Sequence, residues 1–194
     1  MNQLKHDLVQ KVFGITGANN MLAETIDAVT RATRDAHSSN KWQRDIDYIT
    51  VMFGPEDGCP AKERQVMLPS YFSKITEVLV KMPREALPKS VRVAKTYTAH
   101  LANTSNTKAM LLGNVLHVAA PDVFNDIIIG GLKRPNVTDE GYNSWIAVDY
   151  PDVIIYNAAA QVLSDLGDNN SVVNFQLGKT ALDRMILSEE LVNI

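Results

Sequence analysis

The chain has 194 residues, of which 45% are hydrophobic and 21% are charged, and its formal net charge is −3. These are ordinary globular values, so they exclude a wholly disordered protein, and the length suffices for one sizeable domain or two small ones. A slightly acidic balance gives no support to a dedicated nucleic-acid binder. A single cysteine, Cys59, excludes an internal disulfide framework.

The N-terminus lacks the apolar core of a signal peptide, and no run reaches the ~20 apolar residues that span a membrane. We therefore expect a soluble protein that stays inside the cell when it is made.

Apolar residues at helical spacing predict two helices near the N-terminus. The first begins near Leu4 and is expected to end at Gly14. The second covers about 22–36, and Asn19 or Asn20 is expected to cap its start.

The pattern then changes to alternation, which is typical of strands. Strands are predicted at 45–53, 65–68, 74–81, 108–112, 115–118 and 124–132. Gly113 and Asn114 form a two-residue hairpin loop between the fourth and fifth of these. The run 127–129 predicts burial on both faces of the last strand. The pair Gly130 and Gly131 predicts a bulge or a close backbone approach.

The last quarter is predicted to be a helical hairpin. Pro151 suits the first position of its first helix, and Gly167 suits a left-handed cap at its end. One apolar stripe of this helix holds Ile155, Ala158, Ala159, Val162, Leu163 and Leu166. The second helix is expected to point inward Val172, Phe175, Leu182, Met185 and Ile186.

Helices at both ends with strands between them predict an α+β fold, in which the terminal helices pack as one small helical bundle with an inserted antiparallel β-rich domain. The expected boundaries are 1–44 with 139–194 for the discontinuous bundle and 45–138 for the insertion.

Few residues carry a chemical signature. Gly178-Lys179-Thr180 matches the end of a phosphate-binding loop, but the glycine required five positions earlier is replaced by Val173. The four histidines, at positions 6, 37, 100 and 117, lack metal-ligand spacing, so we expect no metal and no cofactor. Cys59 lies in a turn without a histidine nearby, which favours an ordinary loop cysteine.

Charge is distributed unevenly along the chain. The stretch 62–95 has a net charge of +5, and 151–194 has a net charge of −4. Both stretches can be solvated faces, or they can meet across a subunit boundary, where opposite charges would fix the register.

In its whole layout the chain resembles the head-to-tail adaptor (connector, or head-completion) proteins of tailed bacteriophages. The resemblance covers nearly the full length. It rests on Trp42, on VMLP at 66–69, SKITEV at 73–78, GNVLHV at 113–118, IIIGGLKRP at 127–135, Trp145, YPDVIIYNAA at 150–159 and LGD at 166–168.

This resemblance implies a structural virion protein of the neck rather than an enzyme. It would be assembled in the host cytoplasm as a twelve-subunit ring, which binds the portal ring on one side and a tail nozzle or tube protein on the other. Genomic DNA would pass through the channel without sequence preference, and no membrane would be contacted. The residues expected to meet the portal or a neighbouring subunit are Leu187, Glu189, Glu190, Leu191 and Ile194. The residues of an expected basic face are Lys74, Lys81, Arg84, Lys89, Arg92 and Lys95.

Two alternatives remain open at this point. One is a small hydrolase of cell-wall glycan that uses a carboxylate pair among Asp45, Asp47, Asp122 and Asp126. The other is a different ring protein of the tail, either a tail terminator or a tail-tube adaptor.

Overall fold

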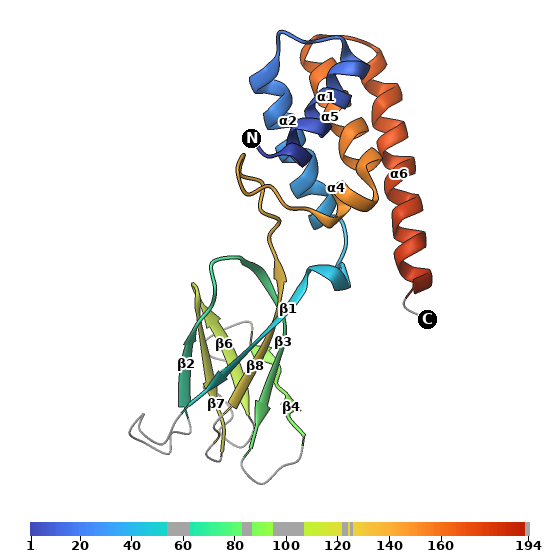
Figure 1. Ribbon diagram of the computed structural model, residues 1–194. Coiled ribbons are helices and arrows are strands. Elements are labelled where there is room, and N and C mark those ends of the chain that lie inside the picture. Colours follow the sequence, from blue (N-terminus) through green and yellow to red (C-terminus); the bar gives the residue numbers. More distant parts are fainter. Residues whose placement is uncertain (54–62, 83–86, 95–106, 122–123, 125, 193–194) are drawn as a thin grey trace. The chain divides into compact units, whose positions relative to one another are not determined.

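The computed structural model describes residues 1–53, 63–82, 87–94, 107–121, 124 and 126–192 (Figure 1). These residues form an α+β fold of helices and two largely antiparallel sheets, as predicted. The chain divides into two compact units. We call residues 1–41 and 135–194 the helical unit, and residues 42–134 the β unit.

The helical unit is built around α5 (Pro151–Asp165), which packs against α1 (Gln3–Thr16), α2 (Leu22–Ser38), α4 (Trp145–Asp149) and α6 (Asn170–Val192). Figure 1 shows these elements around α5. Small residues permit the close approach of α2, which buries Ala28, Ala32 and Ala36. No described helix is long and apolar enough to cross a membrane.

The predicted start and end of α5 are confirmed. Pro151 occupies the first turn, and Gly167 has a φ of 70° just beyond the last turn. The predicted apolar stripe is buried except for Leu166, which follows the helix and is exposed. Val153, Ile154 and Ala160 are buried as well. A helix that is buried on nearly every side is the central element of its unit.

The predicted end of the first N-terminal helix and the predicted cap of the second are wrong, whereas the second helix spans Leu22–Ser38, close to its expected range. Helix α1 continues through Gly14 to Thr16, and Gly17, with a φ of 67°, forms its left-handed cap. Helix α2 begins after Met21 without a side-chain cap, so neither predicted asparagine caps it. A glycine inside a helix costs only about 1 kcal/mol, which the buried side chains of the helix offset.

Helix α6 packs along a single stripe against α5. Its buried residues are Asn174, Gly178 and Met185, which are four and seven residues apart. A Cβ at Gly178 would lie 2.7 Å from Oδ1 of Asn157, so this glycine lets the two helices approach closely. The prediction that Val172 and Phe175 point into the core is wrong: both are exposed. Leu182 and Ile186 are only half-buried.

The β unit contains two four-stranded sheets, whose buried side chains form one core. The first sheet has the order β1 (Ile46–Met52), β8 (Asp126–Lys133), β3 (Phe72–Lys81) and β4 (Lys89–Ser90). The second has the order β2 (Glu63–Met67), β7 (Val115–Ala119), β6 (Lys108–Leu112) and β5 (Val93–Ala94). Among the strand pairs that the structure describes, only β5–β6 is parallel.

The sequence missed β4 and β5, because two-residue strands carry no alternation. It also missed the short 3-10 helix η1 (Gln43–Asp45), so the first strand begins at Ile46.

The two glycines of β8 are where the backbone is approached closely. A Cβ at Gly130 would lie 2.8 Å from the ring of Tyr48, and one at Gly131 would lie 2.5 Å from the ring of Phe72. The pairing of β3 with β8 shifts register beside them, as a bulge does. The predicted close approach is confirmed. Burial on both faces is not: Ile127 and Ile129 are buried, whereas Ile128 is half-buried.

Candidate functional site

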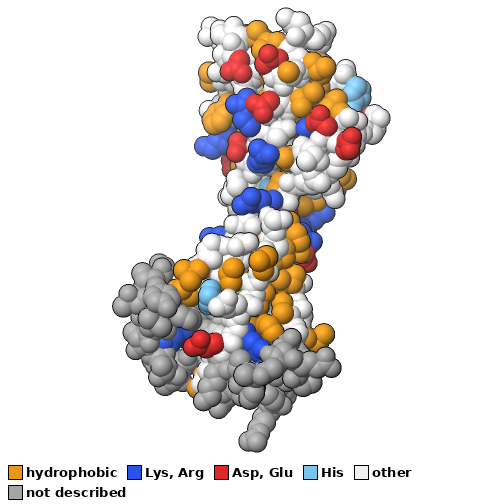
Figure 2. All heavy atoms as spheres, turned by 90° about the vertical axis from the view of Figure 1, so that its left-hand side faces the viewer, with side chains coloured by type: hydrophobic (Ala, Val, Ile, Leu, Met, Phe, Trp, Pro, Cys, Tyr) orange, Lys and Arg blue, Asp and Glu red, His pale blue; other side chains and the backbone are white. Residues whose placement is uncertain are grey.

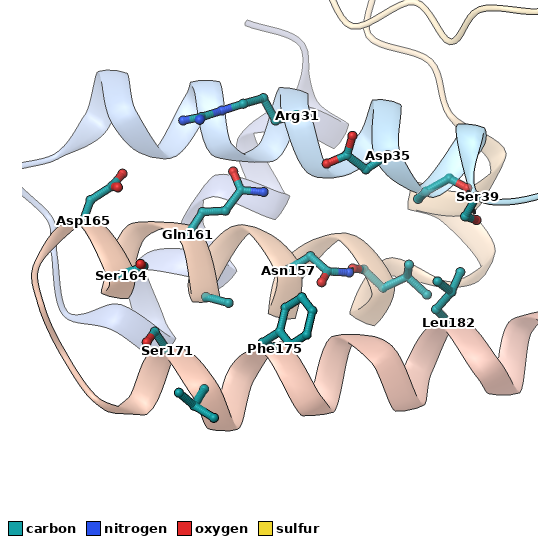
Figure 3. A pocket seen from close by; sticks show the side chains of 14 residues that line it. Arg31, Asp35, Ser39, Asn157, Gln161, Ser164, Asp165, Ser171, Phe175 and Leu182 are labelled. Atoms are coloured by element: carbon teal, nitrogen blue, oxygen red, sulfur yellow. Dashed lines mark hydrogen bonds between the residues drawn. The ribbon is translucent and has the colours of Figure 1, made fainter.

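A groove on the helical unit brings apolar and charged side chains together. It has a volume of about 630 Å³ and lies between α2 and α6, with α5 as its floor (Figure 3). Its apolar lining includes Val153 and Ala160 of α5 and Val172, Phe175 and Leu182 of α6. Val172, Phe175 and Leu182 thus form one wall of this groove.

The charged residues at the groove give it an acidic edge. Asp35 of α2 and Asp165 of α5 line it, together with Arg31. The guanidinium of Arg31 lies 3.0 Å from the carboxylate of Asp27, outside the groove. Because this ion pair engages the only cation among the lining residues, the two lining carboxylates leave the edge negative.

Gln161 gives the groove an unsatisfied acceptor. Its side chain projects from α5 toward α2 (Figure 3), and its Oε1 is buried without a hydrogen-bond donor among the described residues. Asn157, one turn earlier, is different because its Nδ2 donates to the carbonyl of Val153 at 2.7 Å. A buried acceptor without a donor costs about 1–3 kcal/mol, so a ligand that brings a donor would be favoured here.

The opposite side of α6 carries a second unpartnered surface. We call Val173, Leu177, Arg184 and Leu187 the outer flank of α6; all four are exposed. Consecutive members of this set are four, seven and three residues apart in sequence, so all four lie on one side of the helix. Arg184 makes no ion pair with another described residue.

Among the described C-terminal residues singled out by sequence, Leu187 belongs to this flank. Leu187 is 62% exposed and Glu190 is exposed. Glu189 is half-buried, and its Oε1 accepts a hydrogen bond from the hydroxyl of Tyr150 at 3.2 Å. That hydroxyl also donates to Oγ of Ser188 at 3.1 Å, which ties this part of α6 to the start of α5. The side chain of Leu191 and all of Ile194 lie outside the described residues.

The residues of the expected basic face do not all share one face. Lys74 and Lys81 lie opposite Leu132 and Asp126 of β8, which are on the side of the sheet away from Ile127 and Ile129. Lys89 lies opposite the buried Val80, so it belongs to the other side. Arg92 lines a depression of about 520 Å³ with Tyr48 and Glu77. Arg84 and Lys95 lie outside the described residues.

Charges of both signs occur on the helical unit. Figure 2 shows basic and acidic side chains interspersed on the side of this unit that it presents. On the β unit the same view shows several apolar side chains with few charged ones between them.

One possible carboxylate pair, Asp47 with Asp126, is separated by the fold. Asp47 lies opposite Gly131 and Asp126 lies opposite Met52, so they occupy opposite ends of the β1–β8 pair. Asp47 also lies 3.1 Å from the ammonium of Lys133. Asp45 is buried at the end of η1. Asp122 lies outside the described residues.

The other candidate chemical groups have structural positions. Gly178 is a helix contact in the middle of α6, and the hydroxyl of Thr180 donates to the carbonyl of Gln176 at 2.9 Å. Nε2 of His37 lies 2.9 Å from Oγ of Ser144, which caps α4. His6 is exposed and His117 is half-buried; His100 and Cys59 lie outside the described residues. No group of three potential metal ligands occurs within the described ranges.

Sequence patterns gave no sign of one buried charge. Lys5 of α1 is only 2% exposed, and its Nζ donates to the carbonyl of Val137 at 3.0 Å and to Asp139 at 2.7 Å. The ammonium also lies 5.8 Å from the centre of the Tyr142 ring. The ion pair holds the pKa of Asp139 below its usual range. These contacts join α1 to the segment that precedes α4, which is a structural role.

Comparison with known proteins finds no family model that matches the chain and no curated protein that matches it. The residues described above and the resemblance of the sequence to phage adaptor proteins are therefore what indicate a function.

Proposed function

We propose that this chain is a structural subunit of the neck of a tailed-phage particle, where a ring of about twelve copies joins the portal to the tail. In this role the subunit acts through its contacts with neighbours. It would complete the head and continue the channel through which the DNA passes.

The observation that carries the proposal is the incomplete packing of α6. This helix has 23 residues but packs along one stripe against α5. It leaves apolar side chains exposed on two sides, one in the groove and one on the outer flank. Scattered apolar side chains are common on surfaces, but apolar surface gathered beside a groove is typical of an interaction site.

One further observation bears on the alternative of a hydrolase. Asp47 and Asp126 lie at opposite ends of the β1–β8 pair, so these two carboxylates do not form a catalytic pair. Contacts of Lys74 and Lys81 with passing DNA would be directed at phosphates and sensitive to salt, and Asp126 lies opposite Lys81 on the same face of the sheet.

The direct test is electron microscopy of the purified protein with and without portal rings of the phage that encodes it. We expect an additional ring on one end of the portal in the mixture. Portal rings that stay bare at every protein concentration would refute the proposed function.

A truncation tests the portal-binding role of the C-terminus. Removing residues 189–194 keeps the contact between Tyr150 and Ser188, so the helical unit should remain folded by circular dichroism. We expect this variant to lose portal binding. Binding equal to that of the full chain would exclude a portal contact through Glu189, Glu190, Leu191 and Ile194.

A further inference from the structure

We propose that the groove of one copy receives the outer flank of α6 from a second copy, so that copies associate head to tail. This inference deepens the proposed function, because it names the surfaces through which ring subunits would meet. It commits to a second copy of this chain as the occupant of the groove, and three observations support that choice.

The first observation is the arrangement of apolar residues on α6. Val172, Phe175 and Leu182 face the groove, whereas Val173, Leu177 and Leu187 lie on the outer flank. At 3.6 residues per turn the centres of these two sets are roughly 150° apart around the helix axis. A single copy cannot place its outer flank in its own groove, but it can place it in the groove of a neighbour.

The second observation is charge complementarity. The groove carries Asp35 and Asp165, and the one charged residue of the outer flank is Arg184. None of these three makes an ion pair with another described residue. When the flank enters the groove, its guanidinium reaches an acidic edge while Leu177 and Leu187 cover apolar lining.

The third observation is the unsatisfied amide of Gln161. Its buried Oε1 lacks a donor among the described residues, and the terminal torsion of a glutamine rotates easily. Rotation toward the groove would let this oxygen accept a hydrogen bond from an incoming guanidinium, which donates up to five. The occupant is therefore expected to bring a donor as well as apolar side chains, and the outer flank has both.

The same charges disfavour the symmetrical alternative. In a two-fold dimer the same patch of both copies meets. The groove and the outer flank face directions roughly 150° apart around α6, so they do not share one patch, and groove would meet groove or flank would meet flank. Asp35 and Asp165 would then face a second acidic edge, or Arg184 would face another Arg184. A head-to-tail contact pairs opposite charges instead, and it is the kind of contact that closes into rings.

Site-directed cross-linking tests the contact on the free protein. Both partners carry Cys59→Ser, which removes the only native cysteine. One partner has Leu177→Cys on the outer flank, and the other has Ser164→Cys in the groove and a mass tag. After treatment with a short bismaleimide, mixed dimers should exceed either homodimer by about tenfold, because docking raises the effective concentration of the two thiols.

The matched control replaces Leu177→Cys with Lys11→Cys, which puts an exposed cysteine on α1, away from the groove. Mixed dimers at the level of this control would overturn the proposal. An excess of either homodimer would also overturn it, since that result indicates a symmetrical contact.

Charge reversal gives the second arm. Arg184→Glu in the flank partner should reduce the mixed dimer to the control level without changing the melting temperature, because Arg184 is exposed. Asp35→Lys with Asp165→Lys in the groove partner should restore it. Failure to restore would mean that these carboxylates do not meet Arg184.

The outcomes of this experiment are separate from those of the portal test. A protein that binds portal rings but gives no mixed dimer retains the proposed function and loses the proposed contact. A protein that gives the mixed dimer but never binds a portal loses the proposed function and keeps the contact.

Discussion

Helices α5 and α6 are neighbours of similar apolar content, yet they are buried to very different extents. Leu, Val and Ile make up five of the 15 residues of α5 and eight of the 23 residues of α6. Composition therefore does not explain why α5 is enclosed and α6 is largely exposed. The cause is the number of partners: α5 packs against four other helices, whereas α6 packs closely against α5 alone.

This difference identifies the apolar surface that the fold of the chain leaves uncovered. An apolar residue of α5 meets a neighbour on almost any side, so it contributes to folding. On α6 the fully buried stripe is Asn174, Gly178 and Met185, with Leu182 and Ile186 only half-buried. The apolar side chains that α6 leaves exposed contribute little to the fold of this chain, so they can contribute to association.

The largest expected effect comes from truncating one apolar residue on each helix. Ile154→Ala removes a fully buried side chain of α5 and should lower the free energy of unfolding by about 2–5 kcal/mol. Leu187→Ala on α6 should change it by less than about 0.5 kcal/mol, because that side chain is exposed in the free protein. Denaturant unfolding followed by helical circular dichroism measures both. Equal losses would mean that the outer flank is already covered.

A smaller effect is expected where the two helices touch. Alanine normally stabilises a helix relative to glycine, but Gly178→Ala would place a Cβ 2.7 Å from Oδ1 of Asn157. We expect a loss of about 1–3 kcal/mol from overpacking. The matched control is Gly14→Ala in α1, where nothing lies within 4 Å of the new Cβ, and it should stabilise by about 0.5–1 kcal/mol.

A second variant tests the cause of that loss. Adding Asn157→Ala removes the side chain that the new methyl group meets, so the double variant should recover part of the stability. If Gly178→Ala proves as stabilising as Gly14→Ala, the close approach of α5 and α6 is not what selects glycine here.

Helices α5 and α6 also differ in how much of their structure could be predicted from the sequence. The periodicity of α5, with Pro151 at its start and Gly167 beyond its end, predicts its position and its burial, because both signals are local. The α+β order and six of the strands follow from the change of period for the same reason. The inward direction assigned to Val172 and Phe175 failed, because one sequence does not tell how many partners a helix will have.

Only part of the candidate surface could be predicted from the sequence. Leu187 could be singled out as an apolar residue near the end of the hairpin. The groove could not, because it needs Asp35 of α2, Gln161 of α5 and Phe175 of α6 side by side, and they are far apart in sequence. The burial of Lys5 could not be predicted either, because a lysine in a helix is normally exposed to solvent. Here a backbone carbonyl and a carboxylate accept hydrogen bonds from its ammonium and permit its burial.

The packing around α5 can be weakened by a substitution at Tyr142, which precedes α4. Its hydroxyl lies 2.6 Å from that of Thr33 in α2, and burial raises the pKa of Tyr142 from its ordinary value of 10.0 to about 12. Tyr142→Phe should cost about 0.5–1.5 kcal/mol, the worth of one hydrogen bond. Amide hydrogen exchange should quicken in α2 and α5 and remain unchanged in the second half of α6.

The same residue makes a prediction for alkaline pH. A raised pKa means that the folded state holds the phenol proton more tightly, so this stabilisation is complete below pH 10 and is lost as the pH rises through about 12. The wild type should lose stability across that interval relative to Tyr142→Phe. Parallel curves for the two proteins would contradict a buried phenol.

The smallest effect is expected at Asp139, the solvent-exposed partner of the buried Lys5. In Asp139→Asn water can replace the lost carboxylate oxygen, while the carbonyl of Val137 still accepts from the ammonium, so the melting temperature at neutral pH should fall slightly. The sign of the pH dependence is the sharper test. The pKa of Asp139 is lowered by its hydrogen bond with Lys5, so its stabilisation is complete above its ordinary value of 3.8 and is lost as the pH falls through the lower folded value. The wild type and Asp139→Asn should therefore differ at neutral pH and converge in acid. A difference that persists at a pH well below 3.8 would mean that the variant acts through packing and not through the ion pair that joins α1 to the segment preceding α4.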